Sequence, residues 1–304
     1  MKLLITGAWQ DAKNHFEEIK ALGHEIFFMQ WEKDELPCEY DDVEGVICNG
    51  LFLNHPIEKF TNLRYIQLTS AGFDRVPMEY IKEHSIEIHN ARGVYSIPMA
   101  EFAVGGVLQL YKQSGFFAEN QKQHKWEKHR GMLELCGKTV CIVGCGSVGT
   151  ECAKRFKAFG CKIIGVDITV RCDENYDDMV LLSDLDNVLS QSDVIVLTLP
   201  LTDVTRHIIN ADRLSAVKET AVLVNIARGA VIDTNALIET LQREKLGGAV
   251  LDVFEEEPLN EDSPLWDMEN VIVTPHCSFI GENNSIRIND TIIKSITELS
   301  KGRI

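Results

Sequence analysis

The chain has 304 residues, with 30 Lys or Arg and 46 Asp or Glu, so its formal net charge at pH 7 is −16. At roughly 100–200 residues per domain, this length predicts two domains or one large one. So acidic a chain repels phosphate backbones and anionic lipid, which argues against nucleic acid and membrane surfaces as partners. Hydrophobic residues make up 45% and charged residues 25%, a globular composition and not that of a disordered chain.

The sequence shows no targeting segment and no metal motif. No apolar run approaches the roughly 20 residues that a membrane helix needs. Polar Gln10 and Asp11 follow the first apolar run at once, so we interpret residues 2–6 as a strand and not as part of a signal peptide. None of the nine cysteines forms a CxxC pair, so zinc-site spacing is absent. Without an export signal they predict free thiols in the cytoplasm.

Short apolar runs alternate with helical stretches through the first third of the chain. The expected strands are residues 2–6, 26–29, 45–48, 63–69 and 86–89. A helical stretch from about residue 11 to 22 is closed by Gly23. Strands that alternate with helices predict parallel β-α-β units and a doubly wound sheet.

A long helix and a polar segment come next. Pro98 near the first helical position, with Ser96 as the cap, predicts a helix over residues 99–113. Residues 113–135 are polar and predict a surface segment or an arm. A second alternating series follows, and the chain closes with an amphipathic helix over residues 283–300, whose apolar positions are Ile288, Ile292, Ile296 and Leu299.

The second series begins with a dinucleotide-binding pattern. A β-branched strand at residues 139–143 runs directly into a GxGxxG turn and then into a helical stretch. Gly144 permits the tight turn, Gly146 lets the backbone approach a pyrophosphate, and Gly149 allows close packing of helix on strand. A glycine-rich turn that binds nothing is the alternative explanation. The residues that we assign to the cofactor in this loop are Gly144, Gly146, Ser147, Val148 and Gly149.

The residue at the end of the next strand bears on the choice of cofactor. Residues 162–166 lead into Asp167, which lies 18 residues after Gly149. An acid there accepts hydrogen bonds from the ribose hydroxyls and repels a 2′-phosphate, which favours NAD over NADP. Arg171 keeps NADP open, because a nearby Arg can hold that phosphate. The first strand lacks this fingerprint, so only the second α/β unit is expected to bind a dinucleotide.

Polar groups follow the later strands of the second series. These strands end at Pro200, at Arg228, at three glutamates of residues 255–257 and at His276. In an open α/β sheet, ligands bind at the carboxyl ends of the strands. The strand ends therefore predict an Arg, a carboxylate and a His in one crevice beside the cofactor.

These segments together resemble the D-isomer-specific 2-hydroxyacid dehydrogenase family. The NIARG, DVFEEEP and TPH stretches match the family's signatures in the family's order, and the likeness is strong from about residue 61 to 281. It implies two doubly wound, Rossmann-like α/β domains. A flavodoxin-like substrate domain would comprise residues 1–95 and 282–304, with an NAD-binding domain of residues 96–281 inserted into it. It also implies a homodimer formed through the NAD domain.

By this resemblance the catalytic triad is Arg228, Glu257 and His276, with Glu257 selected because it comes immediately before Pro258. Reduction of a 2-keto acid needs a hydride on the carbonyl carbon and a proton on its oxygen. A His side chain, with an ordinary pKa of about 6.5, suits that proton, and a neighbouring carboxylate favours its acid form. Arg228 can bind the substrate carboxylate in a fork and polarise the carbonyl.

The resemblance implies further contacts with substrate and cofactor. Backbone N–H groups of a turn would bind the substrate carboxylate together with Arg228; this turn is Ser70, Ala71 and Gly72. Three residues would lie at the cofactor: Pro200, Ala227 and Asp252. Asp252 would lie near the nicotinamide, although capping of a strand end explains an Asp there equally well.

The substrate side chain is the least determined part of this prediction. The family's phosphoglycerate-acting members carry an Arg in the stretch that corresponds to residues 45–52, and no cation stands there. Leu51 and Phe52 suit an apolar or small substrate side chain, or they simply pack on the core. Oxidation of Cys145 or Cys277 could block function, because one lies in the glycine loop and the other follows His276.

We therefore predict an enzyme that interconverts a 2-keto acid and a D-2-hydroxy acid with NAD(H). A formate dehydrogenase is disfavoured, because in that branch Gln replaces the carboxylate of Glu257. The alternative of a different class is a non-catalytic NAD(H)-sensing module of the same fold, since such proteins can keep the triad. Each residue alone also has an ordinary structural explanation, such as a His that ends a strand or a solvated Arg.

Overall fold

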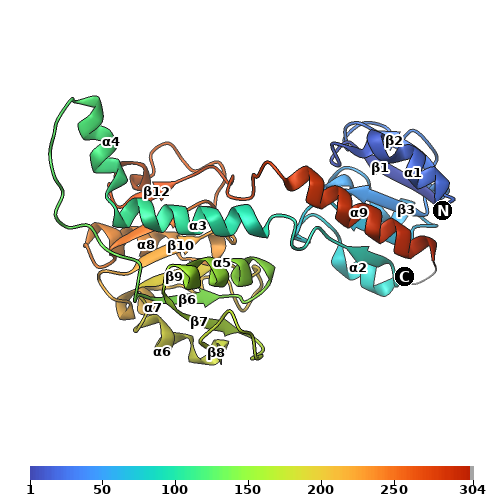
Figure 1. Ribbon diagram of the computed structural model, residues 1–304. Coiled ribbons are helices and arrows are strands. Elements are labelled where there is room, and N and C mark those ends of the chain that lie inside the picture. The colour runs from blue at the N-terminus through green and yellow to red at the C-terminus, as the bar shows by residue number, and fades with distance from the viewer. Residues whose placement is uncertain (302–304) are drawn as a thin grey trace. The chain divides into compact units, whose positions relative to one another are not determined.

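The computed structural model describes residues 1–301, which form two compact units. One unit consists of Met1–Tyr95 together with the chain from Gly281 onward, and the other is Ser96–Ile280. Each unit is built around one parallel sheet with helices on both faces (Figure 1). This confirms the predicted α/β fold class, with one doubly wound unit inserted into the chain of another.

The first unit holds a five-stranded parallel sheet with the order β2-β1-β3-β4-β5. Its strands are β1 (Lys2–Thr6), β2 (Glu25–Met29), β3 (Gly45–Cys48), β4 (Tyr65–Leu68) and β5 (Glu87–His89). This order is the flavodoxin-like one. Leu3 and Ile5 of β1 belong to the apolar cluster on one face, together with residues of α1 (Phe16–Ala21). Leu4 belongs to the cluster on the other face, with α2 (Met78–Glu83).

Helix α9 (Asn284–Ser300) completes the first unit, although it comes from the far end of the sequence (Figure 1). Ile292 and Ile296 are fully buried in the same cluster as Leu3 and Ile5. The indole N–H of Trp9 donates to Asn289 Oδ1 at 2.6 Å. The amphipathic stripe expected from the sequence therefore packs on the first sheet.

The second unit holds a seven-stranded parallel sheet with the order β12-β11-β10-β9-β6-β7-β8. Its strands are β6 (Thr139–Val143), β7 (Lys162–Asp167), β8 (Asp178–Leu181), β9 (Val194–Leu197), β10 (Val222–Asn225), β11 (Gly248–Leu251) and β12 (Val271–Val273). The chain winds outward from β6 to one edge and then, starting at β9, to the other edge. A sheet wound in this way binds its ligand where the order reverses, which here lies between β6 and β9.

Helices cover both faces of the second sheet. One face carries α3 (Ser96–Tyr111) and α5 (Ser147–Ala158), and the other carries α6 (Leu185–Leu189), α7 (Ala211–Ala216) and α8 (Thr234–Gln242). A Cβ on Gly106 would lie 2.6 Å from a methyl group of Val250, so glycine lets α3 approach β11 closely. Among the described helices, none has the length and apolarity needed to cross a bilayer.

Four local features differ from the expectation. The helix expected from residue 11 to 22 is a 3₁₀ turn, Ala12–His15, followed by the short α1. Ser96 is the first residue of α3 and not the cap before it, and its buried hydroxyl has no hydrogen-bond partner among residues 1–301. The polar segment contains α4 (Ser114–Lys122), in which Asn120 is the one buried residue. The edge strand β8 is short and only partly buried, so its residues show little apolar pattern.

Helix α9 should contribute strongly to the stability of the first unit. We expect Ile296→Ala to lower the free energy of unfolding by about 2–4 kcal/mol, because it leaves a cavity in a fully buried cluster. Urea denaturation of the full chain measures this change. Ile286→Ala removes the same atoms from an exposed position of the same helix and should cost less than about 0.5 kcal/mol. Equal losses for the two variants would contradict the packing described here.

Candidate active site

The glycine loop connects β6 to α5 at the point where the strand order reverses. Gly144 has a φ of 96°, and a Cβ there would lie 2.6 Å from the backbone nitrogen of Leu199. A Cβ on Gly149 would overlap the carbonyl oxygen of Gly144. Only glycine fits these two positions, because one needs a left-handed backbone and the other a close backbone approach.

Gly146 differs from the other two glycines of the loop. A Cβ at this position would meet no atom within 4 Å, so the space beside it is open. Gly146 is also the N-cap of α5, and no side chain of the described chain caps that helix end. Backbone amides at an uncapped helix N-terminus attract anions such as a pyrophosphate. The loop, including Ser147 and Val148 in the first turn of α5, therefore fits a dinucleotide.

Asp167 and Arg171 both contact the backbone of the glycine loop. The carboxylate of Asp167 accepts hydrogen bonds from the N–H groups of Cys145 and Ile168, each at 2.7 Å. The guanidinium of Arg171 donates to the carbonyl oxygen of Cys145 and lies 3.5 Å from Asp173. Asp167, which disfavours a 2′-phosphate, and Arg171, which could bind one, thus both contact Cys145 of the glycine loop.

Two substitutions separate the cofactor role of the loop from its structural role. We expect Gly146→Ala to lower the free energy of unfolding by no more than about 1 kcal/mol, because its methyl group enters open space and only the N-cap preference of α5 changes. The dissociation constant for NADH, measured by fluorescence titration, should rise about tenfold or more. Gly149→Ala should instead destabilise the fold itself. Unchanged NADH affinity in the Gly146 variant would contradict this placement of the cofactor.

Arg228 follows β10 on a loop that a buried asparagine holds. The amide of Asn225 donates to the carbonyl oxygen of Arg228 at 3.0 Å and accepts from the N–H of Ala227 at 3.1 Å. Ala227 is buried, and Arg228 donates to its carbonyl oxygen at 2.7 Å. Sequence reasoning did not single out Asn225, although a polar residue at the end of an apolar strand indicates a possible structural or functional role.

Pro200, which was also assigned to the cofactor at a strand end, is exposed after β9.

His276 and Glu257 form a hydrogen-bonded pair at the ends of β12 and β11. The Nδ1 atom of His276 lies 2.8 Å from Glu257 Oε2. The other carboxylate oxygen of Glu257 accepts from the N–H of Phe254 at 3.1 Å. His276 has a φ of 50°, a left-handed conformation that a non-glycine residue rarely adopts. Of the three glutamates, the structure thus places Glu257 beside the histidine.

Asp252 holds the loop that carries His276. Its side chain is fully buried, and one carboxylate oxygen accepts from Thr274 Oγ1 at 2.7 Å and from the N–H of Cys277 at 2.8 Å. The other oxygen accepts from the N–H of Ser278 at 2.9 Å. The N–H of His276 itself donates to the backbone carbonyl of Asp252 at 2.8 Å. The hydrogen bonds of Asp252 therefore orient His276, whatever contact it makes with a cofactor.

The turn of Ser70, Ala71 and Gly72 follows β4 in the first unit. The hydroxyl of Ser70 donates to the carbonyl oxygen of Gly72 at 3.1 Å, and the amide of Asn90 donates to that of Ala71 at 2.6 Å. Over residues 1–301, no hydrogen bond uses the N–H groups of Ala71 and Gly72. Those two donors are available to an anion.

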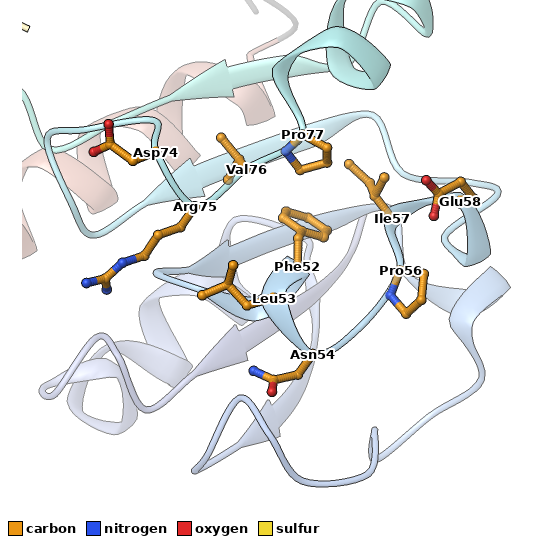
Figure 2. Close-up of a pocket in the computed structure, with 10 residues that line it drawn as sticks. All are labelled: Phe52, Leu53, Asn54, Pro56, Ile57, Glu58, Asp74, Arg75, Val76 and Pro77. Atoms are coloured by element: carbon orange, nitrogen blue, oxygen red, sulfur yellow. The ribbon is translucent and has the colours of Figure 1, made fainter. Parts of the chain in front are cut away.

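A pocket of about 480 Å³ lies in the first unit between the segments that follow β3 and β4. Figure 2 shows Phe52 and Val76 on its apolar walls, with Arg75 at one end and Glu58 at the other. Both segments follow strand carboxyl ends, which is where ligands of parallel sheets bind.

The residues considered for substrate specificity divide between this pocket and the core. Leu51 is fully buried in the apolar cluster of the first unit, so it lines no site. Phe52 packs edge-on against Phe60, with ring centroids 5.9 Å apart, and also lines the pocket. A Cβ on Gly50 would lie 3.7 Å from Arg75 Cδ. The Arg75 side chain therefore lies beside residues 45–52, the stretch that contains no cation of its own. No sequence pattern indicated this contact, because Arg75 follows a different strand.

The two cysteines near the site are poorly reactive by environment. Cys145 is buried, and burial raises the pKa of its thiol to about 11. Burial, together with the neighbouring charge of Asp252, also raises the pKa of the Cys277 thiol. Because the thiolate is the reactive form, the raised pKa of each thiol disfavours its oxidation.

Comparison with known proteins is consistent with this geometry. Residues 104–278 match the family model described as D-isomer specific 2-hydroxyacid dehydrogenase, NAD binding domain. The chain is 34% identical over 249 residues to the glyoxylate reductase of Thermofilum pendens, covering 80% of this chain and 74% of that protein. It is 35% identical over 271 residues to the hydroxypyruvate reductase of Thermotoga maritima, covering 87% of each chain.

A solved structure shows the same architecture. The D-lactate dehydrogenase of Aquifex aeolicus, crystallised with NAD and lactic acid, superposes with a TM-score of 0.81 at 29% identity. The superposition covers 99% of this chain and 96% of that one. The likeness therefore extends over both compact units.

Proposed function

Because the chain belongs to the D-isomer specific 2-hydroxyacid dehydrogenase family, we propose that it interconverts a 2-keto acid and a D-2-hydroxy acid with NAD(H). The observation that carries this proposal is the 2.8 Å hydrogen bond between His276 and Glu257 at the carboxyl edge of the dinucleotide-binding sheet. Arg228 follows β10, the strand beside β11. An acid–base group, its carboxylate and a cation thus come from adjacent strand ends.

His276 is the proton donor and acceptor in this proposal. Its Nδ1–H donates to Glu257, which fixes the tautomer and orients the ring. Within the described chain, Nε2 makes no hydrogen bond, so it is free to face the substrate oxygen. In the reduction direction Nε2–H gives its proton to that oxygen, and in the oxidation direction Nε2 takes the hydroxyl proton. The bound nicotinamide supplies or accepts the hydride at the substrate's C2 carbon.

Arg228 binds the substrate carboxylate in this proposal. A guanidinium can make two parallel hydrogen bonds to a carboxylate, and its charge also polarises the adjacent carbonyl. The anion-binding role of Ser70, Ala71 and Gly72 stays a prediction, supported by the two unused N–H groups of that turn. We propose NAD as the preferred cofactor because Asp167 ends β7 against the glycine loop.

The catalytic pair can be tested directly. We expect His276→Ala to lower kcat by about 10²–10⁴-fold with 2-keto acids, because the proton donor is lost. Glu257→Gln should also lower kcat, whereas Glu256→Gln should leave it unchanged, since Glu256 makes no hydrogen bond in the described chain. NADH oxidation at 340 nm measures the rates, and fluorescence titration should show NADH binding within about twofold of wild type.

Two outcomes would contradict the proposal. Unchanged turnover in the His276 variant would remove this residue from the mechanism. A wild-type protein that binds NADH but turns over no member of a panel would favour the NAD(H)-sensing alternative. The panel should include pyruvate, glyoxylate, hydroxypyruvate and branched or aromatic keto acids, because the same experiment then ranks the substrates by kcat/KM.

We also propose that the chain acts as a homodimer through an arm of the second unit. The arm consists of α4 and the segment that follows it, and it carries an almost fully exposed Trp126 together with exposed Leu133 (Figure 1). Exposed apolar side chains gathered in one segment are typical of contact surfaces, whereas single ones are ordinary.

Substitution in the arm tests the homodimer. We expect Trp126→Ser to weaken self-association about 30-fold or more in sedimentation equilibrium, as loss of a central aromatic contact does. Trp31→Ser is the matched control, because Trp31 is also exposed but lies in the first unit. A monomeric wild type, or equal effects of the two substitutions, would contradict this interface.

A further inference from the structure

The loop that carries Glu257 lacks the backbone hydrogen bonds that hold its neighbours. Over the described chain, no backbone–backbone hydrogen bond involves residues 254–259, although Asp252 and Asn260 on either side both take part in such bonds. Among residues 1–301, the hydrogen bonds that hold this stretch all involve a side chain. The position of Glu257 therefore depends on how those side chains are anchored.

Two glutamates of this loop are anchored in the same way. Glu257 pairs with His276 at 2.8 Å through one oxygen and accepts from the N–H of Phe254 through the other. Glu255 lies 2.8 Å from Nε2 of His207 through Oε2 and accepts from the N–H of Thr234 at 3.0 Å through Oε1. Each carboxylate thus joins one histidine ring to one backbone amide.

The partners of Glu255 come from the loops of two neighbouring strands. His207 lies in the segment after β9 and has a left-handed backbone, with a φ of 49°. Its N–H donates to the carbonyl oxygen of Ala230, in the segment after β10, at 2.8 Å. Thr234 begins α8 in that same segment. A Cβ on Gly229 would overlap the backbone of Phe254, so this segment and the Glu257 loop touch backbone to backbone.

The charge state of Glu255 strengthens this anchor. Partial burial by itself raises the pKa of Glu255, but hydrogen bonds from His207 and Thr234 more than offset it, and the pKa is lowered. The group is therefore ionised near neutral pH. Hydrogen bonds to an ionised carboxylate are shorter and stronger than neutral ones.

We propose that His207 and Glu255 are positioning residues that hold Glu257, and through it the ring of His276, in place for proton transfer. This inference rests on the proposed role of His276. In this proposal His207 and Glu255 act only through the loop, and neither is assigned a contact with substrate or cofactor. A misplacement of about 1 Å at a reacting group can cost about 100-fold in rate. Loss of the anchors of this loop is therefore expected to lower kcat.

A double-mutant cycle tests this role. His207→Gln and Glu255→Ala are each made in the wild type and in the Glu257→Gln variant, with the best substrate of the panel. We expect each to lower kcat about tenfold in the wild type and less than about twofold in the Glu257 variant, because the residue that they position is then already lost. Glu255→Gln keeps an acceptor for the Thr234 N–H and should retain more of kcat than Glu255→Ala.

A matched control and a binding readout complete the cycle. His89→Gln breaks a histidine–glutamate pair of similar exposure, 2.6 Å long, in the first unit, and should leave kcat unchanged. The dissociation constant for NADH should stay within about twofold of wild type in the His207 and Glu255 variants. The same fold loss in both backgrounds would show a general structural effect and overturn the proposal.

Amide hydrogen exchange provides a readout that needs neither cofactor nor turnover. Exchange of the Phe254 amide, the one N–H of residues 254–259 that donates a hydrogen bond within the described chain, should become at least about tenfold faster in His207→Gln and Glu255→Ala, while β10 and β11 keep their protection. Unchanged exchange in this loop would overturn the positioning role. A wild type without dehydrogenase activity would instead overturn the proposed function, so the two failures are distinguishable.

Discussion

Parallel pairing of every strand in the second sheet is the constraint on which the site depends. All loops that follow these strands leave the sheet at the same edge. Segments far apart in the sequence, from the glycine loop to His276, are thereby brought to one side of the unit. The reversal of strand order between β6 and β9 opens the crevice at which such sheets bind ligands.

Orientation within that edge comes from buried polar groups and not from apolar packing. Asp252 accepts three hydrogen bonds from the loop around His276. The side-chain amide of Asn225 donates one hydrogen bond to the loop of Arg228 and accepts another from it. A buried carboxylate or amide can be satisfied in only a few geometries, so these residues restrict the loops more tightly than apolar contacts would. The left-handed backbone of His276 persists because its surroundings determine it.

Sequence reasoning was most successful where one local pattern has one structural solution. The GxGxxG turn after a β-branched strand predicted β6, the loop and the start of α5, and the apolar stripe predicted α9. It failed for α4 and β8, whose few buried residues leave little periodicity to detect. It also assigned Leu51 to a possible substrate contact, whereas the side chain is enclosed in the core.

The sequence by itself determined the fold class, the dinucleotide-binding loop and the types of reactive group at the strand ends, because these follow from short-range patterns and from the order of the motifs. Tertiary structure decided which groups meet. Spacing alone could not choose among three consecutive glutamates, and only the folded loop places Glu257 on His276 and Glu255 on His207. The reason is physical: within the described chain this loop has no backbone–backbone hydrogen bonds, so its shape depends on side-chain partners such as His207 and His276, which are distant in the sequence.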